Sequence, residues 1–138
     1  MSIANQKPTT DTTKPAQNVD FDAFMRANMN RVFNERNGGR RLAALGELYA
    51  DDATFYDPEA VVTGREAISR AVDSLLGHFP PHFVFSAAGP AVGHNGAGRL
   101  FWRLGPPGGP VAVTGTDVAL IAHGRIERLY VFVDPVVG

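Results

Sequence analysis

Two aspartates in apolar surroundings are the residues of this sequence best suited to proton chemistry. The first, Asp57, precedes Pro58 at the end of the segment Leu-Tyr-Ala-Asp-Asp-Ala-Thr-Phe-Tyr-Asp-Pro. A carboxylate held in an apolar pocket is a stronger base than one in water, so Asp57 could remove a proton next to a carbonyl. Alternatively, an aspartate before a proline forms an Asx turn that stabilises the end of a strand. One side chain can serve both purposes.

The second aspartate, Asp117, interrupts an apolar run that continues with Val118 and Ala119. An acid is disfavoured in the middle of a strand, and an unpaired charge is costly to bury. Asp117 could form an ion pair with Arg99 or Arg103 on a neighbouring strand. It could instead line a pocket, partly protonated, and orient a ligand, which is the interpretation we favour. The strand register distinguishes these alternatives.

No other residue pattern indicates a reactive group. Cysteine is absent, which excludes disulfides, thiolate metal sites and a cysteine nucleophile. The histidines occur singly in or near predicted loops, without the spacing or the accompanying carboxylates of a metal site. We therefore predict neither a metal nor a cofactor, because two carboxyl groups suffice for proton transfer. These histidines are His78, His82, His94 and His123.

The length and net charge of the chain limit the classes of protein to which it can belong. The chain has 138 residues, a net charge of -1 and 20% charged residues, so we expect one domain and no binding to nucleic acid or to an anionic membrane. No apolar run reaches the roughly 18 residues of a membrane span, and no secretory signal is visible, which leads us to expect a cytoplasmic protein. Residues 1–18 are polar and aperiodic, which predicts a disordered tail before a single domain over residues 19–138.

Amphipathic segments predict helices in the first half of this domain. The first helix begins at Asp20, a suitable N-cap, and the sequence Asn37-Gly38-Gly39 is expected to end it, since glycine tolerates the left-handed conformation of a C-cap. A short second helix turns Leu45 and Tyr49 inward.

A third predicted helix opens with a capping box, in which Thr63 and Glu66 satisfy each other's free backbone amides, and ends near Gly77. After it the hydrophobic period becomes two, which is typical of strands. Helices followed by antiparallel strands indicate an α+β domain whose three helices pack on one face of a sheet. The predicted strands cover residues 53–56, 82–88, 97–104, 111–122 and 125–133.

The last two predicted strands are apolar on both faces. Val118 and Leu120, for example, alternate with Ala119 and Ile121. A sheet with one solvated face shows a clearer alternation of apolar and polar residues. We therefore expect the helices to cover one face and a partner subunit to cover the other, most simply in a two-fold homodimer through the sheet.

The order of these elements and two motifs resemble the nuclear transport factor 2-like superfamily, and within it the SnoaL-like polyketide cyclases and the ketosteroid isomerases. The motifs are the segment from Leu48 to Pro58 with Gly64-Arg-Glu-Ala-Ile after it, and Thr114-Gly-Thr-Asp117 with the Gly124-Arg-Ile hairpin beyond. The resemblance covers about residues 21–135. It implies a strongly curved sheet wrapped by helices into a cone-shaped α+β barrel, with a pocket for a small apolar molecule in its mouth.

The resemblance also implies roles for particular residues. Asp57 matches the general base of the isomerases, and Asp117 matches the protonated acid of their oxyanion hole. The tyrosine that completes that oxyanion hole corresponds to Phe33, which has no hydroxyl, and a supporting tyrosine corresponds to Val72. We expect these and several aromatic side chains to line the substrate pocket, which is mainly apolar in such sites. The predicted substrate-binding residues are Phe33, Tyr56, Val72, Phe85, Trp102, Tyr130 and Phe132.

Two functions follow from this resemblance. The retained pair of acids favours a cofactor-independent enzyme for acid–base isomerisation, cyclisation or hydration of a small apolar carbonyl compound, with Asp57 as general acid/base and Asp117 as the group that orients the substrate. The missing tyrosine favours the alternative, a non-catalytic ligand-binding or dimerisation module of the same fold, because one fold hosts many functions.

Overall fold

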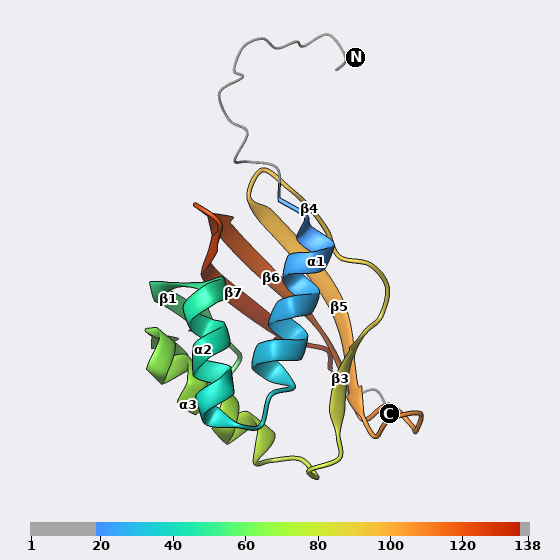
Figure 1. Ribbon diagram of the computed structural model, residues 1–138. Helices are drawn as coiled ribbons and strands as arrows, with labels where there is room; N and C mark the ends of the chain where they lie inside the picture. The colour runs from blue at the N-terminus through green and yellow to red at the C-terminus, as the bar shows by residue number, and fades with distance from the viewer. Residues whose placement is uncertain (1–18, 136–138) are drawn as a thin grey trace, which may run out of the picture.

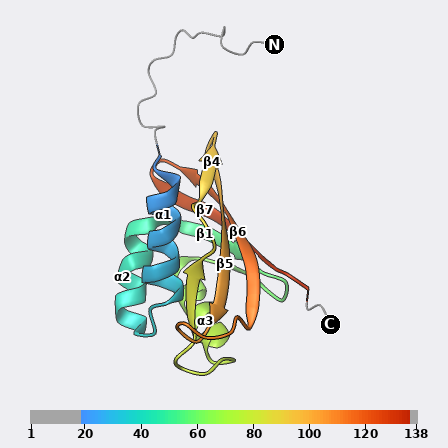
Figure 2. The same cartoon turned by 90° about the vertical axis from the view of Figure 1, so that its right-hand side faces the viewer.

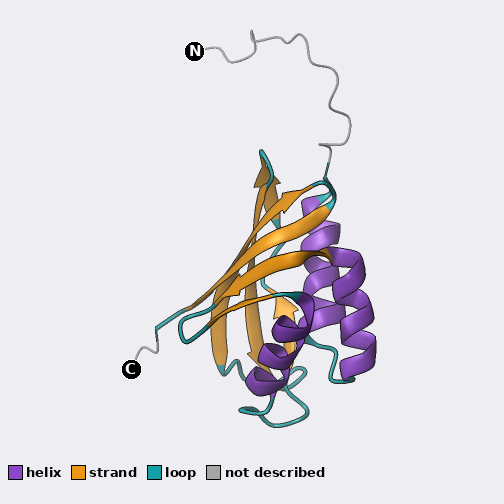
Figure 3. Ribbon diagram, turned by 90° about the vertical axis from the view of Figure 1, so that its left-hand side faces the viewer, coloured by secondary structure: helices purple, strands orange, loops and turns teal. Residues whose placement is uncertain are grey.

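Residues 19–135, which the computed structural model describes, form a curved seven-stranded sheet with three α-helices on one face (Figure 1). The predicted tail, residues 1–18, lies outside the described residues. Strands β1 (Tyr49–Tyr56) and β7 (Arg125–Val133) run parallel, whereas every other strand pair described is antiparallel. The prediction of an α+β fold, with helices packed on a strongly curved and mostly antiparallel sheet, is confirmed (Figure 3).

Strands follow each other across the sheet in the order β2-β1-β7-β6-β5-β3, and β4 pairs with β5 outside that path. Strand β7 has the predicted bounds, and the strand predicted over residues 97–104 begins at residue 97 as expected. Two strands of three residues, β2 and β4, were not predicted, because so short a segment shows no alternation. The other strands are β2 (Val61–Thr63), β3 (Val84–Ala87), β4 (Val92–His94), β5 (Ala97–Gly105) and β6 (Val113–Ala122).

Helix α1 (Phe21–Asn28) begins as predicted, with the carboxylate of Asp20 accepting a hydrogen bond from the backbone N–H of Ala23 at 3.0 Å. A π-helical segment, η3 (Met29–Phe33), continues it. Widened helical turns of this kind are frequent at functional sites. In this chain the segment carries three buried apolar side chains, Met29, Val32 and Phe33.

The prediction that Asn37-Gly38-Gly39 ends the first helix is wrong. That helix ends at Phe33, and Asn37 instead starts helix α2 (Gly38–Leu48), where its side chain accepts a hydrogen bond from the backbone N–H of Arg40 at 2.9 Å. Asparagine serves at either end of a helix, and glycine follows it in both cases, so the sequence was ambiguous. Tyr49, expected in this helix, is the first residue of β1.

The predicted capping box of Thr63 and Glu66 does not form either. Helix α3 (Arg65–Leu76) follows Gly64, whose φ of 99° suits glycine, and no side chain caps it. Thr63 belongs to β2, and its hydroxyl lies 3.0 Å from the hydroxyl of Thr54 on β1. Pairing with the neighbouring strand therefore holds this side chain away from the helix.

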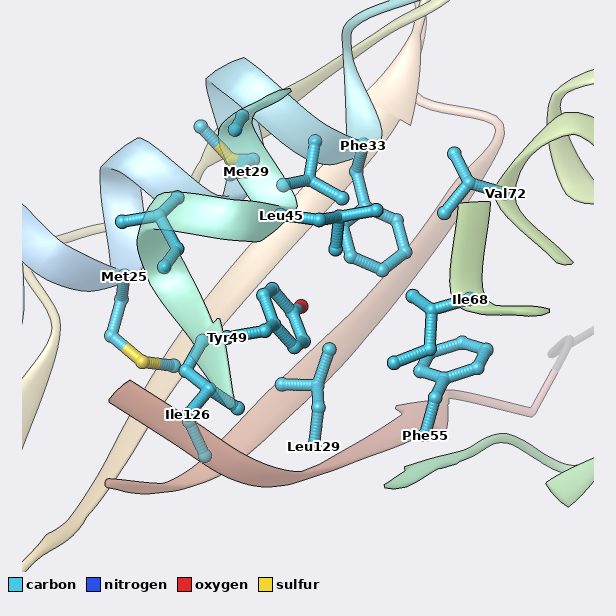
Figure 4. Close-up of a cluster of buried hydrophobic side chains, with 14 of the residues drawn as sticks. Met25, Met29, Phe33, Leu45, Tyr49, Phe55, Ile68, Val72, Ile126 and Leu129 are labelled. Carbon is cyan, nitrogen blue, oxygen red and sulfur yellow. The ribbon is translucent and has the colours of Figure 1, made fainter. Parts of the chain in front are cut away.

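A continuous apolar core fills the space between helices and sheet (Figure 4). Met25 on α1 and Leu45 on α2 point toward Ile126 and Leu129 on β7, and Ile68 closes the core from α3. All five side chains are fully buried. None of the helices within residues 19–135 has the length and apolar composition needed to cross a membrane.

Strand register decides which side chains face this core. Leu100 on β5 lies opposite Asp117 on β6, and both are buried. Phe101, with the opposite orientation, is 46% exposed, and Arg99 and Arg103 share its side of the strand. Figure 2 shows α1 and α2 on one side of β5 and β6. The two arginines therefore lie on the outer face of the sheet, away from Asp117.

We predict that Gly98→Ala destabilises the protein. A Cβ at Gly98 on β5 would lie 2.6 Å from ring carbon Cδ1 of Phe21 and so would push the first residue of α1 off the sheet. Overpacking of this kind costs about 1–3 kcal/mol in the free energy of unfolding, measurable by urea denaturation.

The matched control is Gly46→Ala in α2, where a Cβ meets no atom within 4 Å. This substitution should be neutral or stabilising, by up to about 1 kcal/mol, because alanine favours helix. Equal effects of the two substitutions would show that Phe21 does not fix α1 against β5.

Candidate active site

An apolar cavity of about 190 Å³ lies between the helices and the sheet. Within residues 19–135, Asp57 and Asp117 are the only ionisable side chains that line it, although they are distant in sequence. The remaining wall is formed by η3, the end of α3 with the loop after it, and the inward side chains of five strands or their ends. The lining residues are Met29, Phe33, Phe55, Asp57, Pro58, Leu75, Phe79, Phe85, Trp102, Leu104, Val113, Asp117, Val131 and Val133.

Asp57 follows β1 directly and forms the Asx turn that its sequence context predicts. Its Oδ1 accepts hydrogen bonds from the backbone N–H groups of Glu59 and Ala60, both at 2.8 Å. Its own N–H donates to the carbonyl of Ala60 at 3.0 Å. These contacts fix the carboxylate at the border of the cavity and leave Oδ2 without a hydrogen bond from the described residues. The structural role is thus observed, and the geometry leaves one oxygen free for chemistry.

Asp117 projects from the middle of β6 into the same cavity and is 6% exposed. Its Oδ1 accepts a hydrogen bond from Nε1–H of Trp102 on β5 at 2.9 Å. Burial raises the pKa of Asp117 to about 7, although the hydrogen bond from Trp102 acts in the opposite direction. The carboxyl is therefore largely protonated below neutral pH and can donate a hydrogen bond.

No arginine pairs with Asp117 within residues 19–135, because the candidates point outward. Arg99 lies over the ring of Phe101, with 4.5 Å between its guanidinium carbon and the ring centroid. Arg103 donates to the carbonyl of Ala87 at 3.1 Å. Of the two alternatives for Asp117, the structure thus has the side chain in a pocket.

A glycine creates the space for the hydrogen-bond donor of Asp117. Gly115 on β6 lies opposite Trp102 in the strand register. A Cβ at Gly115 would overlap the six-membered ring of Trp102 and the backbone carbonyl of Phe132. Only glycine lets the indole lie against β6 with its N–H directed at the carboxyl two residues along that strand.

Three aromatic rings in edge-to-face contact form one wall of the cavity. The ring centroids of Phe33 and Phe85 are 6.1 Å apart with an interplanar angle of 83°, and those of Phe85 and Trp102 are 5.3 Å apart at 82°. Asn34 fixes this wall, since its side-chain amide exchanges hydrogen bonds of 2.8 and 2.9 Å with the backbone N–H and carbonyl of Phe85. Such ring pairs add about 0.5–1.5 kcal/mol beyond their buried area.

Of the predicted site residues, the structure brings Asp57, Asp117, Phe33, Phe85 and Trp102 to one cavity. The other four predicted substrate-binding residues do not border it. Val72 is fully buried in the core, and Phe132 is 55% exposed on the outer face. Tyr56 and Tyr130 stack on each other with centroids 4.3 Å apart. The three aromatic residues point outward because each alternates with an inward neighbour on its strand.

Sequence reasoning missed several of the lining residues. Met29, Phe79 and Val131 showed only an apolar character, which core residues share. Tyr49 donates a 2.6 Å hydrogen bond to Oδ1 of Asn28 and does not line the cavity. Burial and the nearby Asp117 raise the pKa of Tyr49 well above its usual range, so its hydroxyl stays neutral. Among the described residues no group of three or more His, Asp or Glu side chains could hold a metal ion.

Comparison with known proteins places these observations in a family. A family model for the SnoaL-like domain matches residues 25–129. A search of curated proteins found no match. The chain is similar to the crystal structure of a proposed isomerase of the SnoaL-like family from Agrobacterium tumefaciens, with 28% identity, a TM-score of 0.75, and coverage of 82% of this chain and 96% of that one.

Two further solved structures share the fold at lower identity. A proposed ketosteroid isomerase from Kribbella flavida has 17% identity and a TM-score of 0.65, with 86% of this chain and 80% of that chain covered. A proposed polyketide cyclase from Sinorhizobium meliloti has 20% identity and a TM-score of 0.63, with 81% and 95% covered.

The raised pKa of Asp117 predicts a pH dependence of stability. Between the ordinary value of 3.8 and about 7, the folded protein keeps a proton that the unfolded chain releases. The contribution of Asp117 to the free energy of unfolding is therefore complete below the lower value and declines as pH rises, by up to about 1.4 kcal/mol per pH unit.

Asp117→Asn should lack this decline, because an amide does not titrate and can still accept the hydrogen bond from Trp102. Urea denaturation of both proteins between about pH 4 and pH 8 measures the difference, in which contributions of other groups cancel. If the free energy of unfolding changed with pH in the same way for both proteins, Asp117 would have an ordinary pKa.

Proposed function

Because the chain belongs to the SnoaL-like domain family, we propose that it catalyses an acid–base isomerisation, cyclisation or hydration of a small apolar carbonyl compound. One observation carries the proposal: two carboxyl groups in different surroundings border one apolar cavity. Pairs of titratable groups whose environments separate their pKa values are typical of acid–base catalysts. Neither group needs a cofactor for proton transfer.

Asp57 acts as the base in this proposal. The two backbone N–H groups that bind its Oδ1 fix the orientation of the carboxyl group. The free Oδ2 removes a proton from the carbon next to the substrate carbonyl. The electrons of that C–H bond then move toward the carbonyl oxygen and form an enolate. Returning the proton to another carbon, or attack of the enolate on an electrophile in the same molecule, completes an isomerisation or a cyclisation.

Asp117 stabilises the enolate oxygen. Since Trp102 donates to Oδ1, the proton of the neutral carboxyl resides on Oδ2, which is free to donate to the substrate. An oxyanion donor of this type is worth about 10²–10³ in kcat. Phe33 contributes no second donor, so the enolate receives less stabilisation than in a site with two.

A second candidate function is ligand binding without turnover, which the apolar side chain of Phe33 at the cavity wall favours. Both functions require the same cavity. They differ in whether Oδ2 of Asp57 removes a proton, so one experiment separates them.

We predict that the protein accelerates exchange of deuterium from heavy water into the carbon next to the carbonyl of small cyclic ketones, measured by proton NMR. Asp57→Asn should lower this rate by about 10²–10⁴, because the amide keeps the Asx-turn acceptor and loses the base. The matched control is Asp52→Asn, which removes the same charge from an exposed position of β1. An unchanged rate in Asp57→Asn would remove Asp57 from the mechanism, and ketone binding without exchange would favour the binding module.

We also propose that two copies of the chain pair through the outer face of the sheet. Phe101 and Phe132 flank Thr116 in the strand register and are 46% and 55% exposed, and the stacked rings of Tyr56 and Tyr130 continue this surface. A second copy would present the same aromatic surface, as an isologous interface requires.

This proposal predicts that Phe132→Asp converts a dimer into a monomer in analytical ultracentrifugation, because a charge at the centre of an apolar interface is costly to bury. Val111→Asp is the matched control, since Val111 is 51% exposed in the loop before β6, away from that surface. A monomeric unmodified protein at high concentration would overturn the proposal.

A further inference from the structure

A second hollow adjoins the apolar cavity and extends it to the surface. We call the cavity of about 190 Å³ the inner cavity, and the neighbouring hollow of about 480 Å³ the outer groove. The outer groove lies between the turn after β1 and the C-terminal half of α3. Its lining residues are Asp57, Pro58, Glu59, Ala60, Ala71, Ser74, Leu75, His78, Phe79 and Val133.

The two hollows are adjacent and share wall residues. Residues common to both are Asp57, Pro58, Leu75, Phe79 and Val133, which we call the neck. Asp57 thus stands at the neck, whereas Asp117 borders only the inner cavity. A substrate that enters past the neck with its carbonyl leading would meet Asp57 first and Asp117 beyond it.

The size of the inner cavity limits the part of the substrate that reacts. An apolar protein cavity of about 150 Å³ binds benzene, so 190 Å³ holds one six-membered ring with a few additional atoms. A fused polycyclic skeleton does not fit beyond the neck. Any remaining part of a larger substrate has to lie in the outer groove.

The polar groups of the outer groove determine which charge and hydrogen-bonding groups the outer part of the substrate can carry. Its ionisable lining residues are Asp57, Glu59 and His78, and no lysine or arginine within residues 19–135 lines it. Nδ1 of His78 lies 2.8 Å from the carbonyl of Ser74, so that nitrogen donates its proton and Nε2 of the neutral ring is left as an acceptor. Two carboxylates and an acceptor nitrogen favour a hydrogen-bond donor or a cation and repel an anion.

We propose that the substrate is a single-ring carbonyl compound with a short hydroxyl- or amino-bearing tail. Its ring occupies the inner cavity, with the carbonyl at Asp117 and the neighbouring carbon at Asp57. Its tail passes the neck and donates hydrogen bonds in the outer groove. This inference rests on the proposed function, because it assigns the carbonyl to Asp117, and it adds the size and charge of the substrate.

The test measures dissociation constants by calorimetry for cyclohexanone and for its hydroxyethyl, aminoethyl and carboxymethyl derivatives, each substituted opposite the carbonyl. The hydroxyethyl and aminoethyl compounds should bind about two- to tenfold more tightly than cyclohexanone, since one hydrogen bond contributes that much. The carboxymethyl compound should bind more weakly than the hydroxyethyl compound, and a steroid ketone should not bind.

Variants of the outer groove and the neck locate these preferences. Glu59→Gln should reduce the discrimination between aminoethyl and carboxymethyl compounds by about two- to fivefold, the size of a solvent-exposed charge effect. Glu66→Gln, which removes an exposed charge from α3 outside the groove, should leave it unchanged. Phe79→Ala should open the neck and allow a fused two-ring ketone to bind.

The outcomes separate this inference from the proposed function. Binding in the predicted order without Asp57-dependent deuterium exchange would support the assigned ligand and reject the enzyme. Exchange that depends on Asp57 but acts equally on the steroid ketone, or tighter binding of the carboxymethyl compound, would overturn the assigned substrate class and leave the enzyme intact.

Discussion

The burial of Asp117 among apolar side chains is the constraint on which the rest of the site depends. Within residues 19–135, its carboxyl group receives one hydrogen bond, from Trp102, and has no cation as partner. Desolvation therefore favours the neutral acid, which can donate a hydrogen bond. That arrangement requires Gly115, because any side chain there would occupy the place of the indole. A backbone position without a side chain thus makes room for the hydrogen-bond donor of Asp117, two residues along the strand.

The second carboxyl lies in different surroundings. Asp57 lies where the chain leaves the sheet, and two backbone N–H groups bind one of its oxygens. Asp57 thus has two backbone donors, whereas Asp117 has only a neutral indole and apolar neighbours. In the proposed function, this difference between a turn at the surface and the middle of a buried strand divides the roles of base and acid.

The helices hold the apolar walls around these two groups. The π-helical segment turns Met29 and Phe33 into the cavity, and Asn34 joins its end to β3. On the other side, the buried guanidinium of Arg41 on α2 donates to Asp73 on α3, with 2.7 Å between Nη1 and Oδ1. This ion pair fixes the helix that carries Leu75 and so positions the neck between the inner cavity and the outer groove.

The sequence by itself determined the fold class, most element positions and both carboxyls, because alternation of apolar residues, turn residues and an acid within an apolar strand are local signals. It did not determine the strand register, which placed Trp102 beside Asp117 and sent Arg99 and Arg103 outward. Tyr56, Tyr130 and Phe132 were predicted at the cavity and lie outside it, because aromatic character is the same on both faces of a strand. Asn37 was expected to end a helix and starts one instead. Thr63 was expected to cap α3 and pairs with Thr54 on the neighbouring strand instead. Register and partner choice depend on contacts between distant segments, and only the tertiary structure decided them.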